Sequence, residues 1–361
     1  MMRICVLGAA SSAHVVARAK VFADFGHDVT LVTPAVGDAQ GLASVTCARG
    51  ALGRFGWLKS VFDAVRRAKA DIYHAHYAAE LTTWMVWVLR RRPLVITVMG
   101  GDVLFDEQGS LGPIGRWLTR RAVLGADLVT VKSPLLGDVV AGWGVKRDRI
   151  MDVVWGVDAR VFSPDADGAA ARRAQWGVGV NDKILFSPRM LKPLYNQVLM
   201  VEALAKTPNV RLVISTYNED AAYRDQVASR ARDLGVEDRV SFVPAVSASE
   251  MAASYSAADV VLSLPPSDGT PQSVMEAMAC GVPVLMTDLD RFKALFTHAD
   301  TGWFAVLTAT AVADGIKTLL SDEDLYARIS TNAQTLVRDR ADFETQARAV
   351  ETRMLQLVGE A

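Results

Sequence analysis

Hydrophobic residues in this chain form short continuous runs that alternate with amphipathic segments. Valine, isoleucine and leucine dominate the runs, and glycine or polar residues end them. In the first half the runs predict strands at Arg3–Leu7, Asp28–Thr33, Asp71–Ala75, Leu94–Val98, Asp127–Val131 and Ile150–Val154. Continuous apolar strands that alternate with helices are typical of parallel sheets with both faces covered.

The alternation restarts in the second half after a segment of different composition. Ser163–Ala174 is rich in Asp, Ala and Gly and predicts a linker. Beyond it, strands are predicted at Lys183–Ser187, Val210–Thr216, Val240–Val243, Asp259–Leu262 and Val284–Thr287. We therefore expect an α/β protein of two Rossmann-like parallel-sheet domains that face each other across a cleft. In such sheets ligands bind beyond the carboxyl ends of the strands.

Composition narrows the class of protein. Of 361 residues 51% are hydrophobic, yet no run approaches the roughly 20 apolar residues that span a bilayer. The N-terminus also lacks the charged region and long apolar run of a secretory signal. The three cysteines form no CxxC pair, which argues against a disulfide framework or a cysteine zinc site and favours the cytoplasm. The net charge of −1 conceals an asymmetry, because residues 1–165 carry 20 basic and 15 acidic side chains and the remainder 19 and 25.

The most informative motif is LPPSDGTPQSVMEAMACGVPVL, at Leu264–Leu285. Thr270 is a suitable helix cap and Pro271 suits the first helical position. The backbone amides of Gln272 and Ser273 then have no intrahelical partner. Together with the helix dipole they predict an anion site suited to phosphate.

Charged side chains surround this predicted helix start. Asp268 precedes the helix and Glu276 lies within it, so their carboxylates are expected roughly 10 Å apart. That spacing suits hydrogen bonds to hydroxyl groups on either side of a diphosphate. Arg189 and Lys192 follow the first strand of the second domain and would add fixed positive charge at the carboxyl end of the sheet.

The first half carries less specific candidates. The small-residue loop Gly8–His14 permits close approach of a ligand, but it lacks GxGxxG, so dinucleotide binding is poorly supported. His74 and His76 fall on one face of a strand with no third ligand nearby, which favours packed or acceptor-side histidines over a metal pair. Leu52–Ala70 is a basic amphipathic helix, for which an ordinary solvated helix is favoured and contact with an anionic membrane stays open.

The chain resembles glycosyltransferase family 4, whose members have the GT-B fold. Glu276-Ala-Met-Ala-Cys-Gly-Val-Pro-Val284 is similar to the second part of the family's donor signature, and Asp268 stands where the family has its first glutamate. Arg189 and Lys192 are similar to the family's arginine–lysine pair, although the usual spacing is five residues. Thr97-Val-Met-Gly-Gly-Asp102 resembles Thr-x-His-Gly-x-Asp, with Met99 in place of the histidine that contacts the donor sugar. Backbone groups of residues 99–101 are the expected replacement.

The resemblance also implies a set of site residues. The reaction centre would contain Arg189, Lys192 and Asp268, and Glu276 would hold the nucleotide ribose. The other donor-binding residues implied are Gly269, Thr270, Pro271, Gln272, Ser273, Val243 and Val246. On the first-domain, acceptor side the resemblance implies Ala10, Ser11, Ser12, His14, His76, Met99, Gly100, Gly101 and Asp102.

The implied activity is retaining, metal-independent transfer of a sugar from a nucleotide-diphosphate donor to a hydroxyl of a glycan, lipid-linked or small-molecule acceptor. No cofactor, metal ion or nucleic-acid partner is expected. The domains would comprise residues 1–165 and 166–340, with 341–361 a helix that crosses back to the first domain. The expected location is the cytoplasm or the inner face of the membrane. A GT-B protein that binds a nucleotide sugar without efficient turnover, and less favourably an epimerase, remain alternatives.

Overall fold

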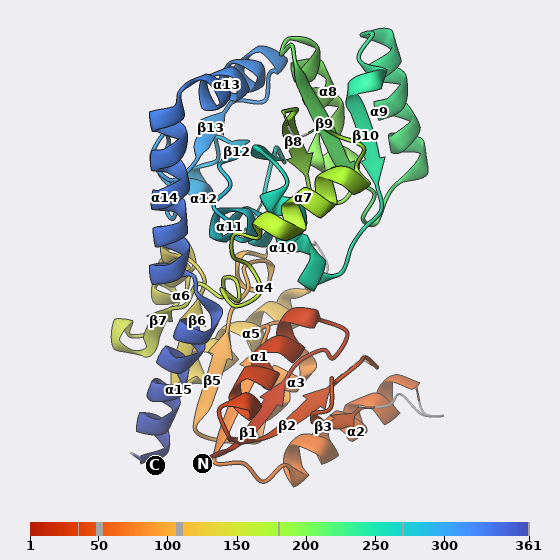
Figure 1. Ribbon diagram of the computed structural model, residues 1–361. Coiled ribbons are helices and arrows are strands. Elements are labelled where there is room, and N and C mark those ends of the chain that lie inside the picture. Colours follow the sequence, from red (N-terminus) through yellow and green to blue (C-terminus); the bar gives the residue numbers. More distant parts are fainter. Residues whose placement is uncertain (35, 48–52, 106–110, 180, 269–270, 360–361) are drawn as a thin grey trace. The chain divides into compact units, whose positions relative to one another are not determined.

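The structure is a computed structural model that describes residues 1–34, 36–47, 53–105, 111–179, 181–268 and 271–359. The chain divides into two compact units (Figure 1). The first comprises Met1–Trp155 with Glu344–Ala361, and the second comprises Gly156–Phe343. The sequence analysis placed the corresponding boundaries at residues 165 and 340.

The first unit contains a parallel sheet with strand order β3-β2-β1-β4-β5-β6-β7. Its strands are β1 (Arg3–Leu7), β2 (Asp28–Thr33), β3 (Ala43–Thr46), β4 (Ile72–His76), β5 (Leu94–Thr97), β6 (Leu128–Val131) and β7 (Ile150–Asp152). Its helices are α1 (Ala13–Asp24), α2 (Gly53–Arg67), α3 (Leu81–Val88), α4 (Gly101–Leu104), α5 (Pro113–Gly125), α6 (Pro134–Gly142) and α15 (Phe343–Gly359), with a 3₁₀ turn at Arg147–Arg149.

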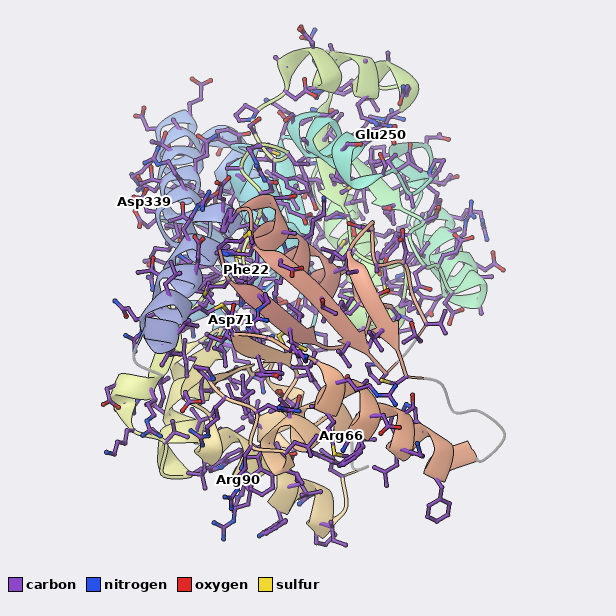
Figure 2. All side chains as sticks on the ribbon, turned by 90° about the horizontal axis from the view of Figure 1, so that it is seen from below. Phe22, Arg66, Asp71, Arg90, Glu250 and Asp339 are labelled. Atoms are coloured by element: carbon purple, nitrogen blue, oxygen red, sulfur yellow. The ribbon has the colours of Figure 1, made fainter. Side chains whose placement is uncertain are left out.

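Both faces of this sheet are covered. Cys5 and Leu7 of β1 pack in a core cluster with Val61 of α2 and Val86 of α3. On the same strand Ile4 and Val6 are equally buried and face the opposite side, because side chains alternate along a strand. Phe22 of α1 is fully buried with its ring edge-on to His74, 5.9 Å between centroids (Figure 2).

The second unit contains a parallel sheet with strand order β10-β9-β8-β11-β12-β13. Its strands are β8 (Lys183–Ser187), β9 (Val210–Ser215), β10 (Val240–Val243), β11 (Val260–Ser263), β12 (Val284–Thr287) and β13 (Trp303–Ala305). Its helices are α7 (Ala166–Gln175), α8 (Gln197–Ala205), α9 (Ala221–Asp233), α10 (Ala248–Ser256), α11 (Gln272–Ala279), α12 (Asp290–Lys293), α13 (Ala309–Ser321) and α14 (Glu323–Arg340), with 3₁₀ turns at Pro193–Tyr195 and Glu237–Arg239.

The predicted class, an α/β protein of two Rossmann-like parallel-sheet domains, is confirmed. The predicted linker at Ser163–Ala174 is wrong, because α7 occupies most of it. Asp165 caps this helix by accepting a hydrogen bond from the backbone nitrogen of Gly168 at 2.9 Å, and alanine has the highest helix propensity. Strands β3 and β13 were not predicted. All four residues of β3 are exposed and β13 has only three residues, so neither produces an apolar run.

The order of the strands places the loops that matter for function. In each sheet the direction of winding reverses between two neighbouring strands, β1 and β4 in the first and β8 and β11 in the second. Loops leaving the carboxyl ends of such a pair diverge and leave room for a ligand. The loops concerned start at Gly8 and Tyr77 in the first unit and at Pro188 and Leu264 in the second. No helix in the described part of the chain is both long and apolar enough to cross a bilayer.

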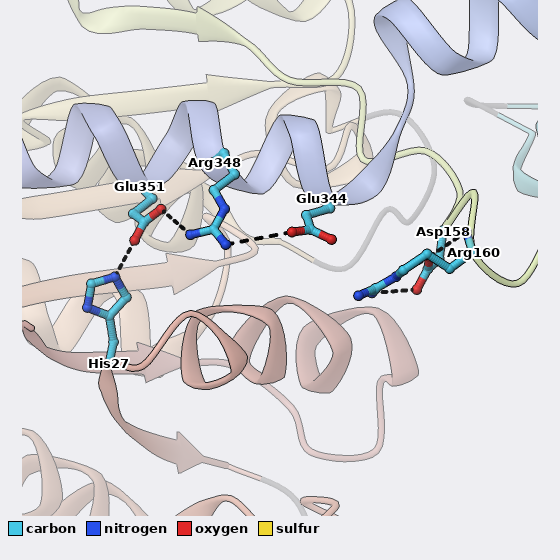
Figure 3. A network of polar contacts seen from close by, with 6 residues as sticks. All are labelled: His27, Asp158, Arg160, Glu344, Arg348 and Glu351. Carbon is cyan, nitrogen blue, oxygen red and sulfur yellow. Dashed lines mark hydrogen bonds and ion pairs between the residues drawn. The ribbon is translucent and has the colours of Figure 1, made fainter.

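Helix α15, at the end of the chain, is bound to the first unit by polar contacts (Figure 3). Glu351 lies 2.7 Å from His27 Nε2, and the two side chains are 13% and 5% exposed. Arg348 forms an ion pair with Glu351 at 3.2 Å, and its guanidinium carbon lies 3.4 Å from the ring centroid of Phe25. Ala347, Val350 and Met354 bury the apolar face of the helix.

We expect Glu351→Ala to destabilise the first unit by about 2 kcal/mol. The substitution removes a mostly buried carboxylate that contacts both His27 and Arg348. Hydrogen exchange of peptides from the first unit would measure the loss. Gln356→Ala, at an exposed position of the same helix, is the control and is expected to change little. Equal protection in the two variants would contradict the role of Glu351.

Candidate functional site

In the second unit, Arg189 follows β8 and is held by three side chains. Its Nη2 forms an ion pair with Asp268 at 2.8 Å, and its Nη1 donates to Ser273 Oγ at 3.2 Å. Its guanidinium carbon lies 4.5 Å from the ring centroid of Tyr195. Arg189 and Asp268 are 14% and 18% exposed, so the pair is shielded from water but reachable. The structure thus brings together three residues that the sequence placed in one site.

Glu276 lies on α11 next to a residue that the sequence analysis missed. Tyr255 of α10 donates its hydroxyl to Glu276 Oε2 at 2.7 Å, and its side chain is fully buried. The rings of Phe186 and Phe162 pack against Tyr255 and fix its direction. Tyr255 carried no signal in the sequence, because it stands in an ordinary amphipathic helix far from any motif.

The surroundings of Glu276 disfavour its charge. Burial raises the pKa of this carboxyl, while the hydrogen bond from Tyr255 and the positive charge of Arg189 act in the opposite direction. A carboxylate that is desolvated but oriented is suited to accept hydrogen bonds from hydroxyl groups of a ligand.

Helix α11 begins one residue later than predicted. Its backbone ladder starts with Val274 and Met275, which both donate to Pro271 O at 3.2 and 3.3 Å. Pro271 is therefore the N-cap residue, and the amides of Gln272 and Ser273 precede the ladder as expected. The Gln272 side chain donates to the carbonyl of Gly156. The predicted site residues Gly269 and Thr270 lie outside the described residues.

Lys192 is three residues from Arg189 in the sequence, but its side chain has a different environment. Its backbone precedes the 3₁₀ turn Pro193–Tyr195, and the side chain is partly exposed. Among the described residues it forms no ion pair or side-chain hydrogen bond. A flexible ammonium group at this position can follow a charged ligand, whereas the Arg189 guanidinium is already oriented.

Val243 and Val246 line a cavity of about 550 Å³ at the end of β10. Trp176 and Arg172 of the α7 region form part of the same lining. An indole ring, valine side chains and a guanidinium make a surface that a flat heterocycle can contact.

In the first unit, Asp102 organises the loops that follow two strands. Its Oδ2 accepts from the backbone nitrogen of Ala78 at 2.7 Å, and its Oδ1 accepts from Met99 and Gly100 at 2.9 and 2.8 Å. The side chain is completely buried, and burial raises its pKa although the three amides oppose this. The amides of Met99 and Gly100 are therefore occupied by Asp102. That backbone groups of residues 99–101 replace the missing histidine stays a prediction.

The loop after β1 is fixed by backbone contacts. Ala10 donates its amide to Thr33 Oγ1 at 2.8 Å, and Ser12 N donates to Ala9 O at 3.0 Å. The backbone of Gly37 packs against this loop. A Cβ atom at position 37 would lie 2.3 Å from the carbonyl carbon of Ala10. Ser11 and His14 are exposed at this loop and the start of α1.

His76 is buried at the carboxyl end of β4. Its ring lies 4.2 Å from that of His74, whose Nε2 contacts Thr97 Oγ1 at 2.8 Å. Neither ring nitrogen of His76 has a hydrogen-bond partner among the described residues. Burial lowers the pKa of both rings, that of His74 to about 3, so both are neutral at pH 7. In the described part of the chain, no three His, Cys, Asp or Glu side chains gather as a metal site.

Arg18 of α1 is a second residue that the sequence analysis missed. Its side chain is buried, with Nη1 3.2 Å from the sulfur of Met99 and the guanidinium carbon 4.8 Å from the Trp155 ring. A signal was present, because Arg18 falls between Val15 and Phe22 on the buried face of an amphipathic helix. A charged residue at such a position is rarely structural alone.

Family patterns match most of the chain. The pattern described as "Glycosyltransferase Family 4" matches residues 11–161, and that described as "Glycosyl transferases group 1" matches residues 169–336. A D-inositol 3-phosphate glycosyltransferase of Mycolicibacterium smegmatis is 30% identical over 283 residues, 75% of this chain. The similar region spans 61% of that relative's length. The enzyme of the same name from Corynebacterium glutamicum is 27% identical, with 74% of this chain and 68% of the relative covered.

Solved structures show the same fold. HepE of Anabaena, crystallised with UDP-glucose, superimposes with a TM-score of 0.81, covering 99% of this chain and all of HepE, at 19% identity. Sucrose-phosphate synthase of Thermosynechococcus elongatus superimposes with a TM-score of 0.79 and complete coverage of both chains, at 20% identity.

The raised pKa of Glu276 predicts how stability of the second unit depends on pH. In the unfolded chain this carboxyl ionises near its ordinary value, whereas in the folded state it holds its proton to higher pH. Its contribution to stability is thus complete below the unfolded pKa and is lost as pH rises through the folded pKa. We expect Glu276→Gln, which keeps an acceptor for Tyr255, to stabilise the unit more at pH 7 than at pH 4. Unfolding in urea at both pH values measures the difference.

Glu250 provides the control, because the sign is reversed there (Figure 2 labels it). Hydrogen bonds from Ser247 in the capping box of α10 lower the pKa of this exposed carboxyl. Glu250→Gln should lose stability at pH 7 relative to pH 4. If both variants shift in the same direction, burial of Glu276 is not the cause.

Proposed function

Because the chain belongs to glycosyltransferase family 4, we propose that it transfers a sugar from a nucleotide-diphosphate donor to a hydroxyl of an acceptor, with retention of configuration and without a metal ion. The observation that carries this proposal is the convergence of Arg189, Asp268 and Ser273 at the start of α11. Fixed positive charge beside free helix amides suits a diphosphate, whose charge increases as the sugar departs.

Each part of the site has a role in this reaction. Arg189 and Lys192 would neutralise the diphosphate as the glycosidic bond breaks, so charge stabilisation would not require a metal. Glu276, oriented by Tyr255, would accept hydrogen bonds from the ribose hydroxyls. The departing diphosphate would take the proton of the acceptor hydroxyl on the face it leaves, which retains the configuration. Asp268 is one methylene shorter than the family's glutamate and would contact the donor sugar after exchanging its bond with Arg189.

The relatives suggest classes of substrate. HepE binds UDP-glucose, which supports a uridine diphosphate sugar as the first donor to test. The relatives from Mycolicibacterium and Corynebacterium are named for inositol 3-phosphate, which supports a phosphorylated polyol among the small-molecule acceptors. A glycan or lipid-linked acceptor at an anionic membrane has separate support, because Phe55, Leu58 and Phe62 of the basic helix α2 are exposed along one stripe.

A protein that binds a nucleotide sugar without turnover is the second candidate. Two features favour it: Met99 replaces the family's histidine, and Asp268 is engaged by Arg189. Release of UDP from UDP-glucose, with inositol phosphate or without an acceptor, distinguishes the two. Tight binding of UDP without release from any donor would support the binding protein.

We expect Glu276→Ala to weaken UDP binding at least tenfold, because it removes the acceptor proposed for the ribose. Tyr255→Phe should weaken binding less, since the carboxylate remains but loses its fixed direction. Calorimetric titration with UDP measures both variants. Pyrophosphate, which has no ribose, serves as the control ligand. If Glu276→Ala weakens the binding of pyrophosphate as much as that of UDP, Glu276 contacts the diphosphate instead.

Arg189→Ala should lower kcat by about 100-fold, the usual effect of removing one strong charge-stabilising donor. The assay is run with and without EDTA, which should leave the wild-type rate unchanged. Arg230→Ala on α9 is the control, because it breaks a more exposed ion pair, with Glu202 of α8, and it should retain activity. A loss below threefold in the Arg189 variant would reject its role at the diphosphate.

A further inference from the structure

The guanidinium of Arg18 is buried without a carboxylate partner among the described residues. Its contacts there are the thioether of Met99 at 3.2 Å and the face of Trp155 at 4.8 Å. A guanidinium carries five N–H donors, and a thioether is a weak acceptor. Burial lowers the pKa of Arg18 to about 9, because it removes water from the charged guanidinium.

Three other shielded arginines of this chain each contact oxygen atoms, although Nε of Arg173 has no hydrogen-bond partner among the described residues. Arg173 pairs with Asp259 at 3.2 Å, and Arg189 pairs with Asp268 at 2.8 Å. Arg239 donates to the carbonyls of Leu204 and Thr207. Burial of a charge costs several kcal/mol unless a partner of opposite charge or hydrogen bonds compensate. Arg18 differs from these arginines because its described partners include no oxygen.

A second cation, Lys132, acts on the same histidine as Arg18. Burial is the main cause that lowers the pKa of His14, and the positive charges of Arg18 and Lys132 lower it further. Burial also lowers the pKa of His74 and His76, and Arg18 adds to both shifts. The Lys132 side chain passes close to Gly100, where a Cβ would lie 3.9 Å from Lys132 Cε. Two cations therefore stand at the Met99–Gly100 loop, while Asp102 is occupied by backbone amides.

Arg18 contacts the one residue of this loop that departs from the family pattern. Met99 stands where the pattern has a histidine that reaches the donor sugar. The backbone amides of Met99 and Gly100 already donate to Asp102. The guanidinium of Arg18 on α1 places an N–H donor 3.2 Å from the Met99 sulfur.

We propose that Arg18 is a specificity residue that binds an anionic group, a carboxylate or a phosphate, on one of the two substrates. The inference deepens the proposed glycosyl transfer and rests on it for the identity of the ligand. A planar guanidinium can bind either group through two parallel hydrogen bonds. The carboxylate would belong to a uronic acid as the transferred sugar, and the phosphate would belong to a phosphorylated acceptor.

The test compares charged and neutral ligands in the full-length protein. Calorimetry measures the affinity for UDP-glucuronate against UDP-glucose and, with UDP present, for inositol 3-phosphate against inositol. We expect a preference of at least tenfold for the charged member of one pair. A preference in the first pair assigns the carboxylate to the donor, and one in the second assigns the phosphate to the acceptor.

Variants of α1 link the preference to Arg18. Arg18→Leu should reduce the ratio of affinities to about one while UDP itself binds within twofold of wild type. Arg18→Lys should retain part of the preference, because the charge remains but the fork is lost. Lys20→Leu removes an exposed cation of the same helix and should change nothing. Arg18→Leu should also raise the midpoint of thermal unfolding, because an apolar side chain replaces a buried charge.

A second measurement does not depend on the donor site. Because Arg18 lies over Trp155, saturating inorganic phosphate or glucuronate should change tryptophan emission, and Trp155→Phe or Arg18→Leu should abolish the change. If the emission changes but the protein does not bind UDP, the proposed sugar transfer is refuted and the anion site is supported. If wild type shows neither the preference nor the emission change, or if Arg18→Leu keeps either one, the inference is wrong.

Discussion

Parallel pairing of every strand with its neighbours is the constraint on which both units depend. It gathers the carboxyl ends of all strands of a sheet at one edge, and the reversal of winding opens that edge between β1 and β4 and between β8 and β11. The loops there lose regular hydrogen bonds and must satisfy their polar groups in other ways. Asp102 does so for three amides in the first unit. In the second, the amides of Gln272 and Ser273 precede the helical ladder of α11.

The two units treat buried charge differently. In the second, the positive charge of Arg189 is balanced by Asp268 at 2.8 Å, and the carboxyl of Glu276 is directed by a tyrosine hydroxyl. In the first, Arg18 is shielded without a described anion and Asp102 carries a carboxyl held by amides. A site that already contains its counter-ion must exchange it when a charged ligand arrives. A site that lacks a counter-ion gains the full electrostatic interaction when the ligand binds. Without the ligand, its buried charge makes the folded protein less stable.

Sequence patterns predicted the strands well where the buried positions carry apolar side chains. Strands β1, β2, β8, β10 and β12 have the predicted bounds. Apolar side chains are frequent in all five, and most of those in β1, β8 and β12 are buried. The exposed strand β3 and the short β13 left no such trace, and α7 was obscured by the residues that cap it. In the site, Arg189, Ser273, Asp268 and Glu276 follow from their motif. Tyr255 and Arg18 could not be found through motifs, since their roles arise from contacts between helices and loops far apart in the chain.

Helix α15 belongs to the same unit as residues 1–155, although residues 156–343 separate the two in the sequence. Residues 1–155 are synthesised before residues 156–343, and α15 is synthesised after both. Until then the surface that will meet Ala347, Val350 and Met354 stays open to water, with His27 and Phe25 beside it. During translation of residues 156–343 the first unit therefore lacks the helix that covers this apolar patch, and exposed apolar surface of this kind promotes aggregation.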